Sequence, residues 1–545
     1  MAEIDRRRFL GVTGAAAATT ALAVHHAAAP SSALPADEAE ADGAPEDALV
    51  VSAVSAITSL DPALAVDTET ERVCRQVFET LIGIERETGN TAPLLAADWS
   101  VSSDELTYTF ELQEGVTFQD GSELTADVVV ANFERWGRLD EIYGEEVLGS
   151  TVPLAFASVF GGFMGDEDCV LESVEAEDEL TVVLTLTEPV VFLLQALTLP
   201  AFGIASAETI SSEEPGQVAE NPVGTGAYQV ASAEGREIVL TAFEDYWNGS
   251  VQAQQVTVRS IPRSFDRLRE LQRGGLDVYD YVTADTLRQL VQSGRMFLQR
   301  DPFSVLYLGF NLEHPVMSEP LVREAVARAV NRGSLVQNHF LEGTRTAHQF
   351  TPAALGVHSD EALRFSMNLE EAERLLEESG YDGEPLPFYY PMNATRSYLP
   401  QPEAVFASIA RDLTRAGLNI RPRPVPWNDG YVDRLLEDGD RAMHLLGRNG
   451  GYRSPHSFFG PLFAKLTSEF NYDNEELREL IHQARSETDE DARGDLYREA
   501  AELIAEDIPA LPLAYPISGL ALGQDVVDYP FSPVLHELFQ DVSLR

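Results

Sequence analysis

Strand and helix signals alternate along this chain from about residue 49 to its end. Leu49-Val50-Val51 begins a predicted strand, and Glu71 to Leu81 follows the spacing of an amphipathic helix. Apolar and polar residues alternate over 107–112 and 180–186, as expected of half-buried strands. Strands interleaved with helices fold into α/β layers. At roughly 100–200 residues per domain, the 545 residues allow about three domain-sized units.

Helix ends are best marked in the second half of the chain. Asn368 and Glu371 predict a capping box for a helix that Gly380 closes, and Asp473-x-x-Glu476 predicts the start of another. A last helix is expected from about 491 to 506. Earlier in the chain, Gly224-Thr225-Gly226-Ala227-Tyr228 predicts a tight structural turn before a strand, because two glycines are too few for a phosphate-binding loop.

The charge of the chain is strongly one-sided. It has 38 Lys+Arg against 89 Asp+Glu, a net charge of −51, and Lys465 is its single lysine. Such a surface repels nucleic acid and anionic lipid, so neither is expected as a partner. Because about 1 M salt shortens the Debye length to roughly 3 Å, this composition favours a salt-loving source over an ordinary acidic protein. A hydrophobic content of 44% excludes a disordered chain, and past the N-terminus no apolar run is long enough for a membrane span.

The N-terminal residues predict export. Arg6-Arg7-Arg8 precedes a mild apolar run from Phe9 to Val24, which is typical of a signal peptide. The arginine pair before Phe9-Leu10 resembles a twin-arginine signal. We therefore expect a signal over 1–29, an acidic disordered linker over 30–48, and a protein at the extracellular face of the cytoplasmic membrane or in the periplasm. No cysteine lies near the apolar run, so no lipid anchor is expected.

Neither metal, cofactor nor enzyme chemistry is indicated. Cys74 lies on a helical apolar stripe and is expected to be a buried, inert thiol, with a Cys74–Cys169 disulfide as the alternative outside the cell. No Cys/His cluster predicts a metal site. The motifs of zinc proteases, serine hydrolases and nucleotide-binding proteins are missing, so the chain is expected not to be an enzyme. Because carboxylates are abundant, a secreted hydrolase with a carboxylate pair remains the alternative of another class.

A series of short segments occurs in a characteristic order. Together they resemble the extracellular solute-binding proteins of ABC importers for peptides and nickel, the family 5 or oligopeptide-type group. The segments are Leu60-Asp61-Pro62-Ala63, Val77-Phe78-Glu79-Thr80-Leu81, Pro93-Leu94-Leu95-Ala96-Ala97-Asp98-Trp99, Thr107-Tyr108-Thr109-Phe110 with Gly115-Val116-Thr117-Phe118-Gln119-Asp120-Gly121, Pro222-Val223-Gly224-Thr225-Gly226-Ala227-Tyr228, Asp245-Tyr246-Trp247-Asn248-Gly249, and Phe310-Asn311 before Val322-Arg323-Glu324-Ala325.

The resemblance implies an α/β, two-lobe, periplasmic-binding-protein-like fold with a hinge. Lobe I is expected at 49–305 plus 510–545 and divided again, and lobe II at 306–509. Such a receptor closes its lobes around a solute and docks on membrane permease subunits. Closure is favoured because the ligand contacts both lobes only when they are shut. We expect a monomer that binds a small solute, with a peptide as the first expectation.

Candidate ligand-binding residues come from two segments of the second lobe and from Trp427. Thr395-Arg396-Ser397-Tyr398-Leu399-Pro400 resembles the motif of the dipeptide-binding subgroup, which implies that Arg396 grips a peptide carboxylate. The alternative is an ordinary surface arginine. Tyr398, Trp427, Asn449, Gly451 and Tyr452 are the further candidates, and the aromatic and amide residues among them could equally be packing residues.

The expected partner of a peptide's α-ammonium is missing. Peptide binders have an aspartate four residues before a proline, whereas Gly451 stands there in this chain, flanked by Arg448 and Arg453. An ammonium beside these cations would be costly to desolvate, so an anionic or N-blocked solute, or another ligand class, is open. Pro455-His456 resembles a pair of nickel-type members, although one histidine is a poor metal site. A nickel-chelate or other small-solute receptor is therefore the rival within the family.

Overall fold

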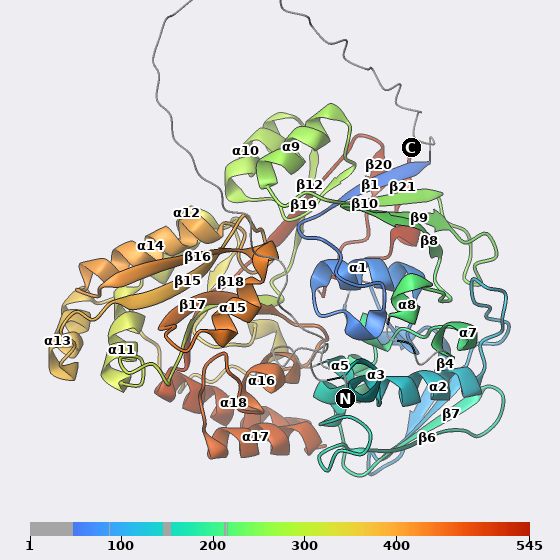
Figure 1. Ribbon diagram of the computed structural model, residues 1–545, viewed down its shortest axis with the longest axis horizontal. Coiled ribbons are helices and arrows are strands. Elements are labelled where there is room, and N and C mark those ends of the chain that lie inside the picture. The colour runs from blue at the N-terminus through green and yellow to red at the C-terminus, as the bar shows by residue number, and fades with distance from the viewer. Residues whose placement is uncertain (1–46, 87, 145–153, 212–213, 215, 533) are drawn as a thin grey trace, which may run out of the picture. The chain divides into compact units, whose positions relative to one another are not determined.

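The computed structural model describes residues 47–545 except 87, 145–153, 212–213, 215 and 533. The expected signal and nearly all of the expected linker lie outside the described residues. The described helices and strands all belong to one compact unit, Pro45–Arg545 (Figure 1). Every helix of the described residues is too short or too polar to cross a membrane.

The first lobe is built on a seven-stranded mixed sheet. Its strand order is β12-β19-β11-β1-β10-β9-β8, and the central β1 runs parallel to β10 and β11. Apolar side chains of α9 and α10 cover one face of this sheet, and those of α1 cover the other. The elements are β1 (Ala48–Ala53), β8 (Tyr228–Glu234), β9 (Glu237–Ala242), β10 (Gln255–Ser260), β11 (Val278–Tyr279), β12 (Met296–Arg300), β19 (Ser518–Leu522), α1 (Thr68–Val77), α9 (Ser264–Arg273) and α10 (Ala284–Gln292).

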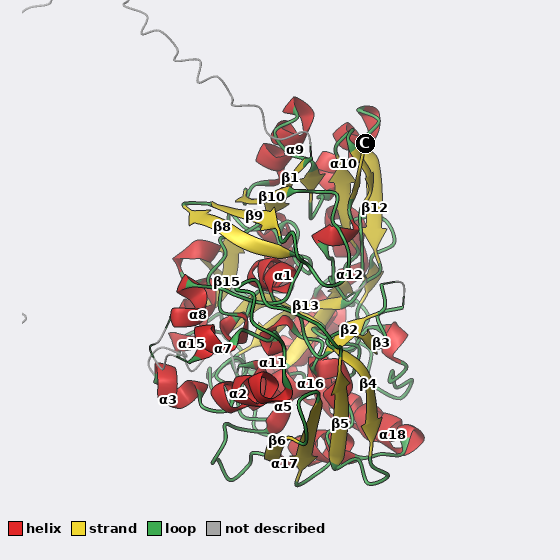
Figure 2. Ribbon diagram, turned by 90° about the vertical axis from the view of Figure 1, so that its right-hand side faces the viewer, coloured by secondary structure: helices red, strands yellow, loops and turns green. Residues whose placement is uncertain are grey.

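A second, antiparallel sheet subdivides the first lobe, as expected. Its order is β4-β5-β7-β6, and β4, β5 and β6 are labelled in Figure 2. The buried side chains of β5 and β7 alternate as the sequence predicts. Helices of the described residues complete its apolar core. The elements are β4 (Ala96–Val101), β5 (Thr107–Leu112), β6 (Leu171–Ala176), β7 (Thr181–Leu186), α2 (Ala126–Trp136), α3 (Leu139–Tyr143) and α5 (Ala155–Phe160). Shorter elements of this lobe are β2 (Ile82–Ile84), β3 (Thr91–Pro93), α6 (Leu193–Ala196), α7 (Ala207–Ile210), α8 (Gln217–Glu220), β20 (Val526–Asp528) and β21 (Ser543–Leu544).

The second lobe is a three-layer α/β/α structure. Its six-stranded sheet has the order β14-β18-β13-β17-β15-β16, and every residue of β13 is buried because helices cover both faces. Helices α11 to α14 pack on one face and α15 to α18 on the other (Figure 1). The strands are β13 (Ser304–Phe310), β14 (Arg345–Thr346), β15 (Leu386–Met392), β16 (Ile420–Pro426), β17 (Met443–Asn449) and β18 (Ala510–Tyr515). The helices are α11 (Pro320–Ala329), α12 (Arg332–His339), α13 (Leu369–Ser379), α14 (Pro402–Arg415), α15 (Tyr431–Glu437), α16 (His456–Phe463), α17 (Glu475–Ser486) and α18 (Glu490–Asp507).

Strand pairing locates the two crossings between the sheets. The chain leaves the first sheet after Arg300 and enters the second at Ser304. It returns between Tyr515 and Ser518, because β18 forms an antiparallel ladder with β13. The expected return at residue 510 is therefore too early by one strand. Two short crossings, widely separated in the sequence, are the arrangement expected of a hinge.

The structure confirms most of the predicted helix ends and corrects the ends of two helices. Helix α13 is capped by Asn368, whose side chain accepts from the Glu371 N–H, and it ends at Gly380 with φ 76°. Helix α17 is capped by Asn474 instead of Asp473, whose carboxylate pairs with Arg478. Helix α1 spans Thr68–Val77 instead of the expected 71–81, because the Asp67 carboxylate caps it three residues earlier and extended backbone follows Val77.

Candidate functional site

Three of the family-like segments meet at one buried carboxylate. Glu79 Oε1 accepts from the Tyr246 hydroxyl at 2.7 Å, and its Oε2 accepts from Trp247 Nε1 and Thr225 Oγ1, both at 2.8 Å. All three donors are neutral, and burial raises the pKa of Glu79. This cluster ties the segment after α1 to the β8 and β9 region, so these segments serve the structure of the first lobe.

The glycine turn belongs to the same arrangement. A Cβ atom at Gly224 would lie 2.1 Å from the Val77 carbonyl oxygen, and one at Gly226 would lie 2.5 Å from that of Gln76. The Gln119 side-chain amide donates to the Tyr228 carbonyl at 2.7 Å. Only glycine permits such close backbone approach, which confirms that the turn is structural.

The candidate ligand-binding residues follow the carboxyl ends of parallel strands. Strands β15, β16 and β17 run parallel to one another. Arg396 lies four residues beyond β15, Trp427 directly follows β16, and Asn449 is the last residue of β17. Because parallel strands end at the same edge of a sheet, three loops bring these side chains together. This edge is where open α/β sheets bind their ligands.

At this edge the two lobes touch through side chains from both. Arg396 Nη1 donates to Ser55 Oγ at 3.1 Å, and Asn449 Nδ2 donates to Thr68 Oγ1 at 3.1 Å. Ser55 follows β1 and Thr68 begins α1, so the first lobe also presents the end of a strand and the start of a helix. Neither Ser55 nor Thr68 belongs to a recognisable motif, and the sequence alone did not indicate them.

Arg396 is a buried cation with few partners. It is 9% exposed, its Cζ lies 3.8 Å from the centre of the Trp427 ring, and its Nε has no hydrogen-bond partner among the described residues. Ser55 is its one side-chain acceptor in the described part of the chain, and the described carboxylates form no ion pair with it. A guanidinium has five N–H donors, so this one has capacity left to hold an anion.

Asn449 joins two loops of this site, whereas Tyr398 belongs to the core. Ser397 Oγ donates to Asn449 Oδ1 at 2.6 Å, which connects the loops after β15 and β17. Tyr398 lies in the apolar core of the second lobe, so close to Gly447 that a Cβ there would be 2.4 Å from its ring. Burial raises the pKa of Tyr398 to about 12.

Gly451 and Tyr452 contact the first lobe. A Cβ at Gly451 would lie 2.8 Å from Leu199 Cδ2, and the Tyr452 ring stacks on Phe192 with centroids 5.5 Å apart. The flanking Arg448 donates from Nε to the Ser457 carbonyl at 2.7 Å. Leu199 therefore occupies space that an aspartate side chain at 451 would need.

His456 and Cys74, which were considered for metal and thiol chemistry, are buried. The rings of His456 and Phe192 stack with their centres 4.2 Å apart. Burial lowers the pKa of His456 to about 3. Cys74 and Cys169 are free, and Cys74 is buried, as expected of an inert thiol. Within the described residues, no group of three or more His, Cys, Asp or Glu side chains could hold a metal ion.

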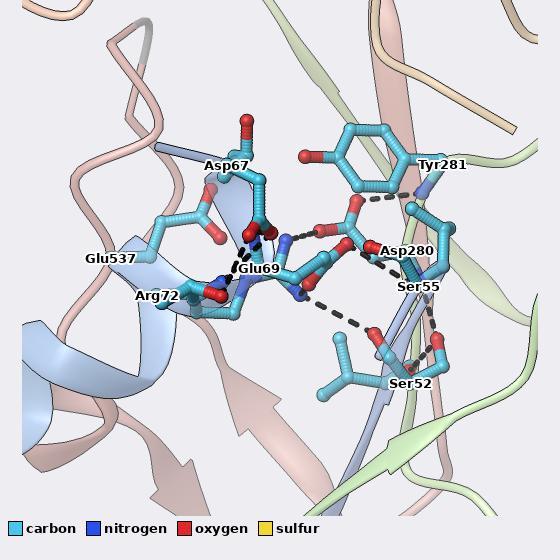
Figure 3. Close-up of polar contacts among 12 residues, drawn as sticks. Ser52, Ser55, Asp67, Glu69, Arg72, Asp280, Tyr281 and Glu537 are labelled. Carbon is cyan, nitrogen blue, oxygen red and sulfur yellow. Dashed lines mark hydrogen bonds and ion pairs between the residues drawn. The ribbon is translucent and has the colours of Figure 1, made fainter. Parts of the chain in front are cut away.

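A buried charge network lies beside the first crossing, and Figure 3 shows its members Glu69, Arg72, Asp280 and Glu537. Arg300, the last residue of β12, donates to Asp280 at 2.6 and 3.0 Å and to Glu537 at 2.5 and 2.8 Å. Arg72 of α1 also pairs with Asp280, and its Nη1 lies 3.5 Å from Glu69 Oε2. All five side chains are at most 4% exposed. The network thus joins α1, β12, the segment after β11 and the C-terminal segment next to the hinge.

The arginines of the network act on the pKa of Asp280, and Glu69 links the network to the interlobe contact. Burial alone would raise the pKa of Asp280, but Arg300 and Arg72 lower it to about 2. Glu69 Oε1 accepts from the Val54 N–H at 3.1 Å, and Val54 precedes the Ser55 that receives Arg396. The sequence alone did not indicate this network, because its members come from four separate segments of the chain and share no motif.

A family model matches much of the chain. The model for bacterial extracellular solute-binding proteins, family 5, matches residues 90–470. The chain belongs to this family. The family 5 assignment agrees with the collinear segments and with the two lobes of the structure.

Family 5 relatives match over nearly their whole length. Heme-binding protein A of Haemophilus influenzae is 26% identical, covering 93% of this chain and 94% of the relative. The dipeptide-binding protein of Escherichia coli is 26% identical, covering 86% of this chain and 89% of the relative. A solved dipeptide-binding protein of Pseudoalteromonas in complex with Met-Leu has a TM-score of 0.83 at 21% identity, covering 91% of this chain and all of that one. This last likeness shows the two-lobe fold.

Proposed function

We propose that this protein is the solute receptor of an ABC importer and binds a peptide-like solute with a free carboxylate between its lobes. It delivers the solute unaltered to permease subunits in the membrane, and it acts as an exported monomer. The family and the relatives with peptide-binding names support this class. The acidic composition supports a working environment of high salt.

The observation that carries the proposal is the state of Arg396. A buried charge is costly unless it is paired, yet this guanidinium has one neutral side-chain acceptor and a stacking partner among the described residues. A carboxylate can take two of its N–H donors side by side. Since Arg396 comes from the second lobe and its acceptor Ser55 from the first, an anion bound here would contact both lobes and favour closure.

The surroundings of Gly451 support a solute without a free ammonium at that point. Leu199 fills the space, and Arg448 and Arg453 are the nearest charged residues in the sequence. Arg453 donates to the Thr88 carbonyl at 2.6 Å, so it crosses to the first lobe. An N-blocked peptide would place an uncharged group here and avoid a desolvated ammonium.

The experiment is a titration of the full chain in about 2 M salt with N-acetyl-Ala-Ala, Ala-Ala and N-acetyl-Ala-Ala-amide. We expect the first to bind best and the amide, which lacks the carboxylate, to bind worst. Arg396→Ala should weaken binding of N-acetyl-Ala-Ala about 10- to 150-fold, as expected from losing a charge-assisted hydrogen bond. Arg288→Ala, an exposed arginine on α10, is the matched control and should leave affinity unchanged.

Three results would contradict the proposal. Equal affinity of Arg396→Ala and wild type for N-acetyl-Ala-Ala would exclude the carboxylate contact. Hydrolysis of the peptide during the titration, detected by mass spectrometry, would favour the hydrolase alternative. Tighter binding of a nickel chelate than of any peptide in the same assay would favour the rival receptor of the same family.

A further inference from the structure

We propose that a basic groove beside Trp427 is a second binding site, which takes an acidic side chain or second carboxylate of the solute held at Arg396. This inference rests on the proposed function. The basic groove is defined by four arginines, Arg236, Arg259, Arg263 and Arg269, together with Trp427 and its neighbours. Its volume is about 780 Å³, enough for several peptide side chains.

Both lobes line the basic groove. The first lobe contributes the start of β9, the end of β10 and the start of α9, and the second lobe contributes Asn393, Pro426, Trp427 and Asn428. Thr395 Oγ1 donates to the Pro262 carbonyl at 3.3 Å, which joins the two walls one residue before Arg396. A ligand in this groove would therefore contact both lobes, as a ligand at Arg396 does.

Trp427 connects the groove to the carboxylate site. It lines the groove, and its ring centre also lies 3.8 Å from the Arg396 Cζ. A solute whose carboxylate binds Arg396 thus has the groove within reach of its neighbouring side chains. The two sites together would select a solute with two negative groups.

The arginines of the groove are unequally paired. Arg259 Nε lies 2.6 Å from Glu237 Oε1, and Arg269 Nη2 lies 3.0 Å from Asp266 Oδ1. The side chains of Arg236 and Arg263 are exposed and form no hydrogen bond or ion pair with the described residues. Two guanidiniums that line the groove are therefore available to an anion.

The local balance of charge is opposite to that of the chain. The chain has 89 acidic residues and 38 Lys+Arg, whereas the groove has four arginines and three acids, Glu237, Asp266 and Glu270. A local excess of cations on a strongly acidic surface attracts an anionic ligand to that place and repels a cationic one. Guanidiniums match carboxylates in geometry as well as charge.

The test compares N-acetyl-Ala-Glu-Glu with N-acetyl-Ala-Gln-Gln on the full chain, at two salt concentrations. Wild type should bind the Glu peptide about tenfold more tightly, and this preference should shrink as salt rises. The double variant Arg236→Gln/Arg263→Gln should bind both peptides equally while keeping the wild-type affinity for the Gln peptide. Arg288→Gln, exposed on α10 outside the groove, should keep the preference.

The outcomes distinguish failure of the groove proposal alone from failure of the proposed function. If both peptides bind wild type equally, the groove is not a binding site, while the receptor function stands. If the preference persists in the double variant, other residues cause it and the groove is likewise overturned. If neither peptide binds, the peptide-receptor function fails and the groove proposal fails with it. If the melting temperature of the double variant is unchanged, its loss of preference for the Glu peptide is not caused by unfolding.

Discussion

Asp280→Asn is the substitution that most directly tests the buried charge network. Asp280 is fully buried and accepts from both Arg72 and Arg300. Asparagine has nearly the same volume, so it opens no cavity, but its amide group would point N–H donors at a guanidinium. Removing one partner of a buried ion pair costs about 3–5 kcal/mol.

This free energy corresponds to a measurable shift in melting temperature. At ~2.1 cal/mol/K per residue, a cooperative unit of about 300–500 residues has an unfolding entropy near 0.6–1 kcal/mol/K. We therefore expect Asp280→Asn to lower the melting temperature by about 3–8 °C in differential scanning calorimetry. Asp495→Asn, which removes an exposed partner of Arg498 on α18, is the matched control and should change it by less than about 1 °C.

A second test is how the difference in melting temperature between wild type and Asp280→Asn depends on pH. The pKa of Asp280 is lowered from 3.8 to about 2 in the folded state, so its ionised form stabilises the fold above pH 3.8. This contribution is lost as the pH falls from 3.8 towards 2. The gap in melting temperature between wild type and Asp280→Asn should therefore narrow over that range. A variant as stable as Asp495→Asn at pH 7, or a gap independent of pH, would refute the reasoning.

Other buried groups lead to three further predictions. Glu79→Ala should destabilise the first lobe by about 2–4 kcal/mol in chemical unfolding because it leaves buried donors unpaired, whereas Glu79→Gln should be milder; equal effects would contradict the arrangement. Cys74, whose pKa burial raises, should resist a thiol reagent in the native state while the partly exposed Cys169 reacts; the reverse order would be inconsistent with the packing. Gly451→Asp should lower the melting temperature, and adding Leu199→Ala should restore it; no rescue would mean that Leu199 is not the obstacle.

The sequence predicted the layers and lobes well because local patterns encode them. The alternation at Tyr108, Phe110 and Leu112 reflects one buried sheet face, and the cap at Asn368 reflects hydrogen bonds within one turn. The return crossing was misplaced by one strand. Residues 510–515 are apolar and buried like any central strand, and only their pairing with β13 shows which sheet they join.

The candidate site was predictable only in part. Arg396 belongs to a recognisable motif, and in the structure its guanidinium stacks on the Trp427 ring. Its acceptor Ser55 and the exposed Arg263 of the basic groove come from the other lobe and from segments without a motif. Such partners become visible only when folding places distant loops at one edge. Tyr452 was a candidate that could line the pocket or pack, and it packs into the core of the first lobe's second sheet.

The central claim is that two lobes close on a carboxylate-bearing solute. Small-angle X-ray scattering of the full chain in about 2 M salt, with and without saturating N-acetyl-Ala-Ala, measures closure directly. We predict that the radius of gyration falls when the peptide binds wild type and does not change for Arg396→Ala at the same peptide concentration. Peptide binding to wild type with an unchanged radius of gyration would contradict the account.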